Sequence, residues 1–184
     1  GIDGLAGSLA IVTIIGIILF DAVTKNPPLL GFLLMFSAAL LPYLFTNLIS
    51  AQKIFLGDAG SLLIGFILAW ILVFLSQGDS RSMVPTSVLC CVAIPVIDTF
   101  TVCFQRIRTG KSPLSADRQH FHHLLLDAGF SPKKALLIIL FFASSLLVLG
   151  LILQRVFPSA SLSIFILITL VYIYWSSVKK NAFT

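Results

Sequence analysis

Two aspartates stand in settings where a carboxylate could take part in chemistry. Asp3 precedes a glycine at the start of an apolar run, and Asp58 lies in the glycine-rich segment FLGDAGS. Glycines beside Asp58 let the backbone come close to a ligand, and a carboxylate there can hold Mg²⁺ through oxygen while leaving positions for phosphate. Capping of a helix N-terminus is the competing interpretation for both aspartates.

A second candidate is the basic segment of residues 106–123, which contains every histidine of the chain. Its basic and imidazole side chains are Arg106, Arg108, Lys111, Arg118, His120, His122 and His123. Guanidinium groups match phosphate oxygens in pairs, and imidazoles can donate hydrogen bonds or protons near neutral pH. A solvated basic loop would not gather three histidines within four positions, so the segment predicts a phosphate site. A zinc site is the alternative, disfavoured by the lack of a nearby cysteine and by the positive surroundings.

The composition excludes a soluble domain. Hydrophobic residues make up 58% of the 184 residues, against 12 Lys and Arg and 7 acidic residues, all of them aspartate. A soluble domain has roughly 45–50% apolar and about 25% charged residues. We therefore predict an all-α, polytopic integral membrane protein embedded in a lipid bilayer. The net charge of +5 then indicates basic loops at the inner surface rather than a nucleic-acid partner.

Six apolar stretches are long enough to cross about 30 Å of hydrocarbon as helices. They lie near residues 5–22, 29–46, 60–76, 85–104, 133–154 and 159–178. Alternating loops then carry nine basic residues on one side and three on the other, which predicts that the first side faces the cytoplasm.

The longest loop on that cytoplasmic side covers residues 105–132. Helical spacing of its apolar residues predicts a short helix over 117–128, lying on the membrane surface and ended by Gly129. If that segment is helical, His120 and His123 share one flank and His122 lies on the other. Ser131 and Pro132 are typical of the start of the fifth span.

Asp98 lies inside the fourth predicted span. Acids within a membrane are energetically expensive and are usually functional. An ion pair with the region of Arg106 and Arg108 is favoured slightly over direct catalysis, because these arginines follow about two helical turns later.

The predicted topology brings Asp3, Asp58 and the basic segment to one face of the membrane. Helix-capping aspartates would have no reason to coincide with the basic segment there. Acids holding a metal on one wall and cations on the other suit a diphosphate, whose charge must be neutralised as a phosphoanhydride bond breaks.

Three ordered motifs carry a family resemblance. Residues 1–5 (GIDGL), residues 55–61 (FLGDAGS) and the segment from Ser112 to His123 resemble motifs of the polyprenyl-phosphate N-acetylhexosamine-1-phosphate transferases, glycosyltransferase family 4. Within the family the sequence DRQHFHH is more similar to the N-acetylglucosamine branch than to the muramyl-pentapeptide branch, because Phe121 interrupts the histidine run.

This resemblance implies a phosphoglycosyltransferase that moves an N-acetylhexosamine 1-phosphate, expected to be that of GlcNAc, from a UDP-sugar to undecaprenyl phosphate and releases UMP. It implies Mg²⁺ or Mn²⁺ as cofactor, with Asp58 as the metal ligand. Asp3, Asp58 and His123 would be catalytic. The nucleotide sugar would be bound by Arg106, Arg108, Lys111, Arg118, His120, His122 and His123. The expected location is the bacterial inner membrane, with the site facing the cytoplasm, at the first membrane step of a cell-surface polysaccharide such as O-antigen.

The chain also departs from the family pattern. It lacks the adjacent aspartate pair of an earlier loop, so we interpret residues 1–184 as the C-terminal part of one transferase domain, inactive by itself. Gln105 stands where relatives often have an arginine. A transporter or channel fragment, and the same enzyme with another UDP-amino sugar, remain alternatives, as does a homodimer for the assembly.

Overall fold

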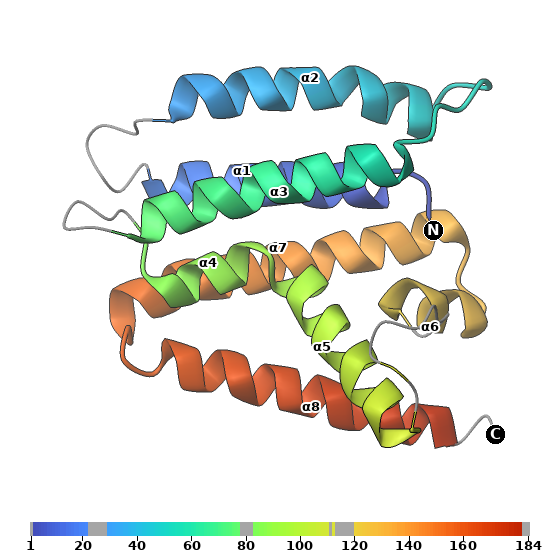
Figure 1. Cartoon of the computed structure of the whole chain (residues 1–184), viewed down its shortest axis with the longest axis vertical. Helices are drawn as coiled ribbons and strands as arrows, with labels where there is room; N and C mark the ends of the chain where they lie inside the picture. The colour runs from blue at the N-terminus through green and yellow to red at the C-terminus, as the bar shows by residue number, and fades with distance from the viewer. Residues whose placement is uncertain (1, 22–28, 78–82, 111, 113–119, 182–184) are drawn as a thin grey trace.

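The chain folds entirely into helices over the residues that the structure describes. This computed structural model describes residues 2–21, 29–77, 83–110, 112 and 120–181. The helices are α1 (Leu5–Asp21), α2 (Leu30–Leu48), α3 (Gly57–Ser76), α4 (Pro85–Cys91), α5 (Ala93–Arg108), α6 (Phe121–Asp127), α7 (Pro132–Val156) and α8 (Ser161–Asn181) (Figure 1). The predicted all-α class is confirmed for this part of the chain.

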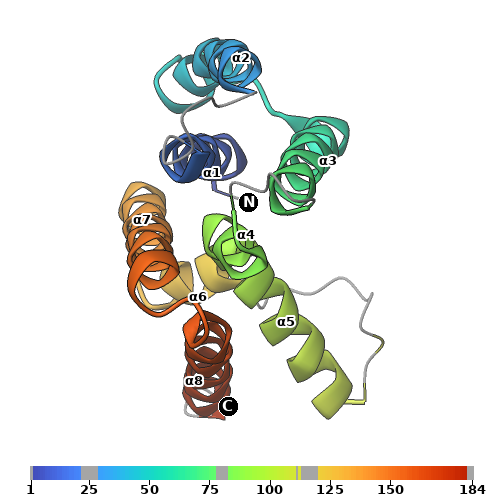
Figure 2. The same ribbon diagram turned by 90° about the vertical axis from the view of Figure 1, so that its left-hand side faces the viewer.

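Helix α1 is the centre of the bundle. It packs against α2, α3, α4 and α7, while α8 lies on the far side of the α4 and α7 pair (Figure 2). Ile14, Ile17 and Phe20 of α1 are completely or almost completely buried in the main apolar core. Large apolar side chains stay exposed along α2, α3 and α8, among them Met35, as lipid contact requires.

The fourth predicted span is not one straight helix. It is broken at Val92 into α4 and α5, whose axes differ by 85°. Pro95 has no N–H for the carbonyl of Cys91, and the hydroxyl of Thr13 on α1 donates to that carbonyl instead, at 3.0 Å. The predicted span over 85–104 is therefore helical but bent, and the missing N–H of Pro95 removes one of the bonds that would have kept it straight.

Three helices are long and apolar enough to cross a membrane. They are α2, α3 and α7, and the bent pair of α4 and α5 counts as a fourth if it is one broken span. Helices α1 and α8 contain shorter apolar stretches, Leu5–Phe20 and Ser161–Ser177. All six predicted segments are therefore helical and the protein is a membrane protein, but these lengths support three or four crossings within the described residues rather than six.

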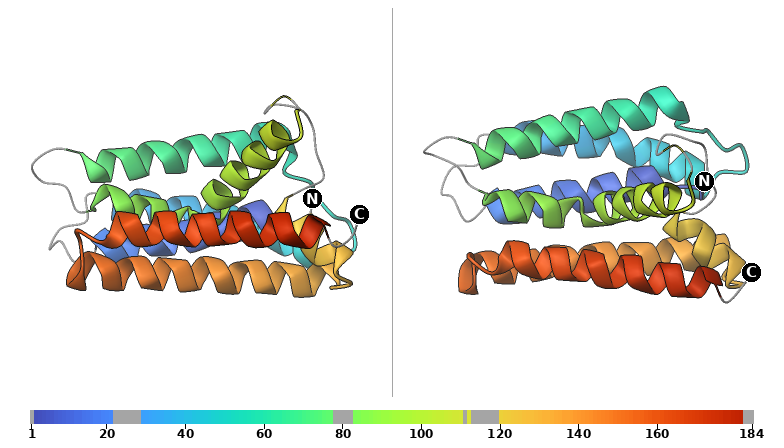
Figure 3. Two further views of the ribbon diagram at one scale, coloured as in Figure 1. Left: turned by 90° about the horizontal axis from the view of Figure 1, so that it is seen from below. Right: turned by 60° about the horizontal axis from the view of Figure 1, so that its bottom comes forward.

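One end of the bundle gathers the segments that the sequence singled out. The start of α1, the α2–α3 connection, the last turn of α5, α6 and the start of α7 lie at this end, which we call the site end (Figure 3). Among the cations whose side chains the structure describes, the site end carries Lys53, Arg106, Arg108, Lys133 and Lys134, and the opposite end carries Arg155. This asymmetry agrees with the predicted distribution of positive charge.

Candidate active site

Helix α6 displays the histidines at the site end. It begins at Phe121 instead of residue 117, after His120 in an extended conformation, and residues 113–119 lie outside the described residues. Gly129, at a φ of +86°, follows the end of α6, as predicted. The hydroxyl of Ser131 accepts the N–H of Lys134 at 3.5 Å at the start of α7, which confirms the predicted cap. Lys111 and Arg118, two predicted phosphate ligands, also lie outside the described residues.

The three imidazoles form one cluster. The ring of His122 is 5.8 Å from that of His120, parallel to it, and 4.1 Å from that of His123. The prediction that His122 lies on the opposite flank was wrong, because His120 precedes the helix and does not follow its periodicity. Burial and then the neighbouring charges of His123 and His120 lower the pKa of His122 to about 4. His122 is therefore neutral at pH 7.

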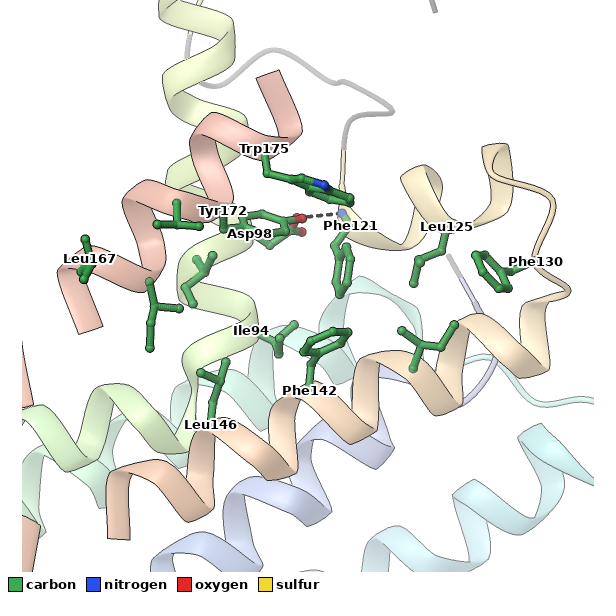
Figure 4. Close-up of a pocket in the computed structure, with 14 residues that line it drawn as sticks. Ile94, Asp98, Phe121, Leu125, Phe130, Phe142, Leu146, Leu167, Tyr172 and Trp175 are labelled. Atoms are coloured by element: carbon green, nitrogen blue, oxygen red, sulfur yellow. Dashed lines mark hydrogen bonds between the residues drawn. The ribbon is translucent and has the colours of Figure 1, made fainter. Parts of the chain in front are cut away.

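Asp98 of α5 holds the start of α6. One carboxylate oxygen is 2.8 Å from Nδ1 of His120, and the other accepts the backbone N–H of Phe121 at 2.7 Å (Figure 4). The favoured prediction for Asp98, an ion pair near Arg106 and Arg108, was wrong. The bend before α5 turns Asp98 toward α6, whereas the arginines lie at the far end of α5.

The last turns of α5 carry one buried side chain that packs against α8 and one exposed arginine. Gln105 is buried and donates from Nε2 to the hydroxyl of Ser176 on α8 at 2.9 Å, so this residue fastens α5 to α8. Arg106 is half-buried and Arg108 is exposed at the site end. Arg108 is thus accessible to an anionic ligand, whereas Gln105 has a structural role.

Asp58 lies in the first turn of α3. The helix begins at Gly57, whose φ of +68° favours glycine, and the capping position is held by Leu56 without a side-chain hydrogen bond. Asp58 is exposed, and its carboxylate contacts no hydrogen-bond or ion-pair partner among the described residues. Asp58 therefore makes no capping hydrogen bond within the described part of the chain, although its charge lies at the positive end of α3, and its oxygens are available to a ligand.

Asp3 is tied to the α2–α3 connection. Its carboxylate forms an ion pair with Lys53, and both side chains are partly exposed. Asn47, which is 2% exposed, accepts the N–H of Gly4 and donates to the carbonyl of Ile54 at 2.7 Å. Sequence reasoning missed Asn47, although an amide near the end of an apolar helix was a usable signal. Through these bonds the turn that carries Asp3 is fixed beside the segment that leads to Asp58.

The donor chemistry at the site end suits magnesium better than zinc. Among the described residues, no three His, Cys, Asp or Glu side chains are grouped so that they could hold a metal ion. Zinc is usually held by three or four such protein ligands, and the described histidines are not grouped in that way. Mg²⁺ is commonly held by one or two carboxylates together with water and substrate phosphate, and the free carboxylate of Asp58 fits that role.

An apolar cavity adjoins the histidine cluster. It has a volume of about 750 Å³ and lies between α5, α6, α7 and α8 (Figure 4). Phe121, Phe142 and Tyr172 contribute aromatic rings to its wall, and Asp98 is the one charged group among the described residues that line it. The cavity therefore combines a lipid-like interior with one carboxylate, which is already engaged by α6.

Comparison with known proteins places these features in a family. The family model described as glycosyl transferase family 4 matches residues 1–76. An undecaprenyl-phosphate alpha-N-acetylglucosaminyl 1-phosphate transferase of Yersinia pestis is 38% identical over 95% of this chain and 49% of its own length. The protein of the same name from Escherichia coli K12 is 42% identical over 83% of this chain and 42% of its own.

The alignment to these relatives extends beyond the family model to nearly the whole chain. The chain spans about half the length of the curated relatives it matches. No solved structure matches it. The matches confirm the resemblance based on the three motifs: the chain belongs to glycosyl transferase family 4.

Proposed function

We propose that this chain supplies the cytoplasmic catalytic end of an enzyme that transfers GlcNAc 1-phosphate from UDP-GlcNAc to undecaprenyl phosphate and releases UMP. The observation that carries the proposal is the pairing, at one end of the bundle, of an exposed carboxylate, Asp58, with a histidine cluster fixed on α6. The names of the relatives give the acceptor and the transferred group.

In this proposal the histidines and arginines bind the diphosphate of the donor. His120, His123 and Arg108 are accessible on the site end, and neutral His122 can accept or donate one hydrogen bond. Arg106 from the described part, and Lys111 and Arg118 outside it, add positive charge to the same segment. Donors aimed at the diphosphate stabilise the charge that develops on the leaving UMP.

Asp58 is the proposed ligand for Mg²⁺ or Mn²⁺, and Asp3 the second catalytic aspartate. A bound divalent ion would neutralise phosphate charge and polarise the bond that breaks. Asp58 contributes a carboxylate with no other bond to the part of the chain that the structure describes, while Asp3 is positioned by Lys53 and by the neighbouring Asn47 network.

The lipid acceptor would approach from the bilayer. The 750 Å³ cavity beside α6 offers apolar volume for part of an isoprenoid chain, close to the histidine cluster. We further propose that the six helical segments act as membrane crossings in a bacterial inner membrane, with the site end in the cytoplasm. The shorter apolar stretches of α1 and α8 would cross together with their flanking residues or where the bilayer is locally thinner.

The experiment that tests the function is a transfer assay with the full-length protein that contains these residues. Purified protein, UDP-GlcNAc, undecaprenyl phosphate and Mg²⁺ should give UMP and a lipid-linked GlcNAc diphosphate in equal amounts. The transporter alternative predicts that UDP-GlcNAc is moved unchanged. UDP-GalNAc in place of UDP-GlcNAc tests the donor sugar, and greater UMP release from UDP-GalNAc would reassign it.

Orientation is tested with matched cysteines at the two ends of α7. Lys133 and Ser159 are both exposed and lie at opposite ends of the bundle. In intact cells, an impermeant maleimide should label Ser159→Cys but not Lys133→Cys until the inner face is opened. The reverse pattern would place the site end outside the cytoplasm and contradict the proposed use of a cytosolic sugar nucleotide.

A further inference from the structure

Asp98 is the described carboxylate with the most complete set of bonds to the site. Its two oxygens lie 2.8 Å from Nδ1 of His120 and 2.7 Å from the backbone nitrogen of Phe121, and its side chain is 19% exposed. The two bonded groups are consecutive in sequence, so one carboxylate fixes both a side chain and the first residue of α6. A general capping role would need only the second bond.

The helix that carries Asp98 is itself held in place. The break at Val92 sets the direction of α5, and Gln105 near its other end is bonded to Ser176 of α8. Phe121 packs its ring edge-on against Phe142 of α7, at 6.2 Å, and against Tyr172 of α8, at 5.5 Å. The carboxylate and the start of α6 therefore meet between elements with fixed positions.

The bond to Asp98 also decides which nitrogen of His120 carries the proton. A carboxylate accepts hydrogen bonds, so Nδ1 of the imidazole must donate. Nε2 lies on the other side of the ring, and the His120 side chain is 38% exposed. Orienting a functional imidazole through its other nitrogen is a recurrent use of a carboxylate in proteins.

We propose that Asp98 is a positioning residue for the transfer reaction, which holds His120 with Nδ1 protonated and Nε2 directed toward the diphosphate of the sugar nucleotide. This inference rests on the proposed function. Asp98 does not itself bind the substrate, because both of its oxygens are engaged and its negative charge would repel phosphate. It acts on the reaction through His120.

The test is a double-mutant cycle in the full-length protein, with UDP-GlcNAc and undecaprenyl phosphate as substrates. Asp98→Asn keeps the shape and an oxygen for the N–H of Phe121, but its amide would donate to Nδ1 and reverse the imidazole tautomer. We expect kcat/KM to fall roughly 10- to 100-fold. Asp127→Asn, which removes a charge from an exposed residue at the other end of α6, is the matched control and should change kcat/KM less than about twofold.

The cycle separates positioning from a merely structural role. In a His120→Ala background, Asp98→Asn should change the residual kcat/KM by no more than about twofold, because the group through which Asp98 acts is gone. An equal loss of kcat/KM with and without His120 would overturn the proposal and leave Asp98 as a fastener of α6.

A spectroscopic measurement tests the same contact without turnover. In protein labelled with ¹⁵N-histidine, the resonances assigned by their loss in His120→Ala should show a protonated, hydrogen-bonded Nδ1, and Asp98→Asn should move the proton to Nε2. An unprotonated Nδ1 in the unsubstituted protein would overturn the proposal, even if Asp98→Asn failed to fold. Absence of any transfer activity with the expected spectrum would instead refute the proposed function and leave the Asp98–His120 contact established.

Discussion

Asp58 and Asp98 are two carboxylates that serve the same end of the molecule in opposite surroundings. Asp58 is exposed and contacts no hydrogen-bond or ion-pair partner among the described residues, while both oxygens of Asp98 are bonded and only 19% of its side chain is exposed. The comparison separates two uses of an aspartate. A free carboxylate can exchange water for a cation at little cost, whereas an engaged one would first have to give up the bonds that hold α6.

The largest effect is expected from Asp58→Asn in the full-length protein. The amide keeps the shape but loses the charge that holds a divalent ion, so turnover should fall by about 10³-fold. A Mg²⁺ titration of UMP release should show half-saturation at a higher concentration, with part of the lost rate recovered. Unchanged turnover with an unchanged metal curve would remove Asp58 from the mechanism. Asp58 would then not be the metal-binding carboxylate that the comparison with Asp98 assumes.

His123→Ala tests the proposed diphosphate-binding histidines of α6 independently of the metal. The imidazole of His123 is accessible at the site end, and its loss removes one donor to the diphosphate. Transition-state stabilisation should decrease by about 2–4 kcal/mol, measured as kcat/KM, while the Mg²⁺ titration keeps its midpoint. A shift of that midpoint would mean that the histidines and Asp58 do not act on separate parts of the donor.

The pH dependence of stability reports on the histidine cluster. Since His122 has a pKa of about 4 in the folded protein against the ordinary value of 6.5, protonation favours the unfolded state. Its contribution to stability is complete above pH 6.5 and is lost as pH falls from 6.5 toward 4. The thermal midpoint in detergent should therefore drop over this range, and His122→Gln should flatten the drop. An equally steep drop in the variant would assign it to other groups.

The helical segments followed from composition, but their geometry did not. Apolar runs of about 20 residues located all six segments, because a lipid-facing helix needs little beyond length and hydropathy. The break at Val92 depends on a proline whose missing donor is compensated by Thr13, about 80 residues earlier. A single proline in an apolar run can kink a helix or begin a new one, and the choice depends on neighbours that the run does not contain.

The sequence indicated the candidate site residues by their type, but it did not indicate the contacts that these residues make. Glycines around Asp58 and the crowding of three histidines indicated chemistry directly from residue type. The partner of Asp98 was missed because spacing along one helix favoured Arg106. The observed contact is made by His120, which follows 22 residues later in the chain. Asn47 was missed for the same reason, since its bonds to Gly4 and Ile54 join segments that no local pattern relates.

The smallest effect is expected at the third aspartate, whose surroundings are intermediate between those of Asp58 and Asp98. Within the described residues the carboxylate of Asp3 pairs with Lys53, and the side chains of Asp3 and Lys53 are 35% and 46% exposed. Solvent screens such a pair, so Lys53→Met should lower the free energy of unfolding by less than about 1 kcal/mol. Raising the salt concentration should bring the unsubstituted protein closer to the variant.

The matched control for Lys53→Met is Lys133→Met, which removes an exposed cation at the start of α7. Chemical unfolding in detergent at low and high salt measures both variants, and kcat/KM shows whether Asp3 depends on its partner. Because the Asn47 network still fixes the turn before α1, kcat/KM should change only a few-fold, within about 1 kcal/mol. A loss of kcat/KM as large as that of Asp98→Asn would mean that Lys53 positions Asp3 as Asp98 positions His120. Asp3 would then resemble Asp98, whose carboxylate is engaged in bonds, rather than lie between Asp98 and the exposed Asp58.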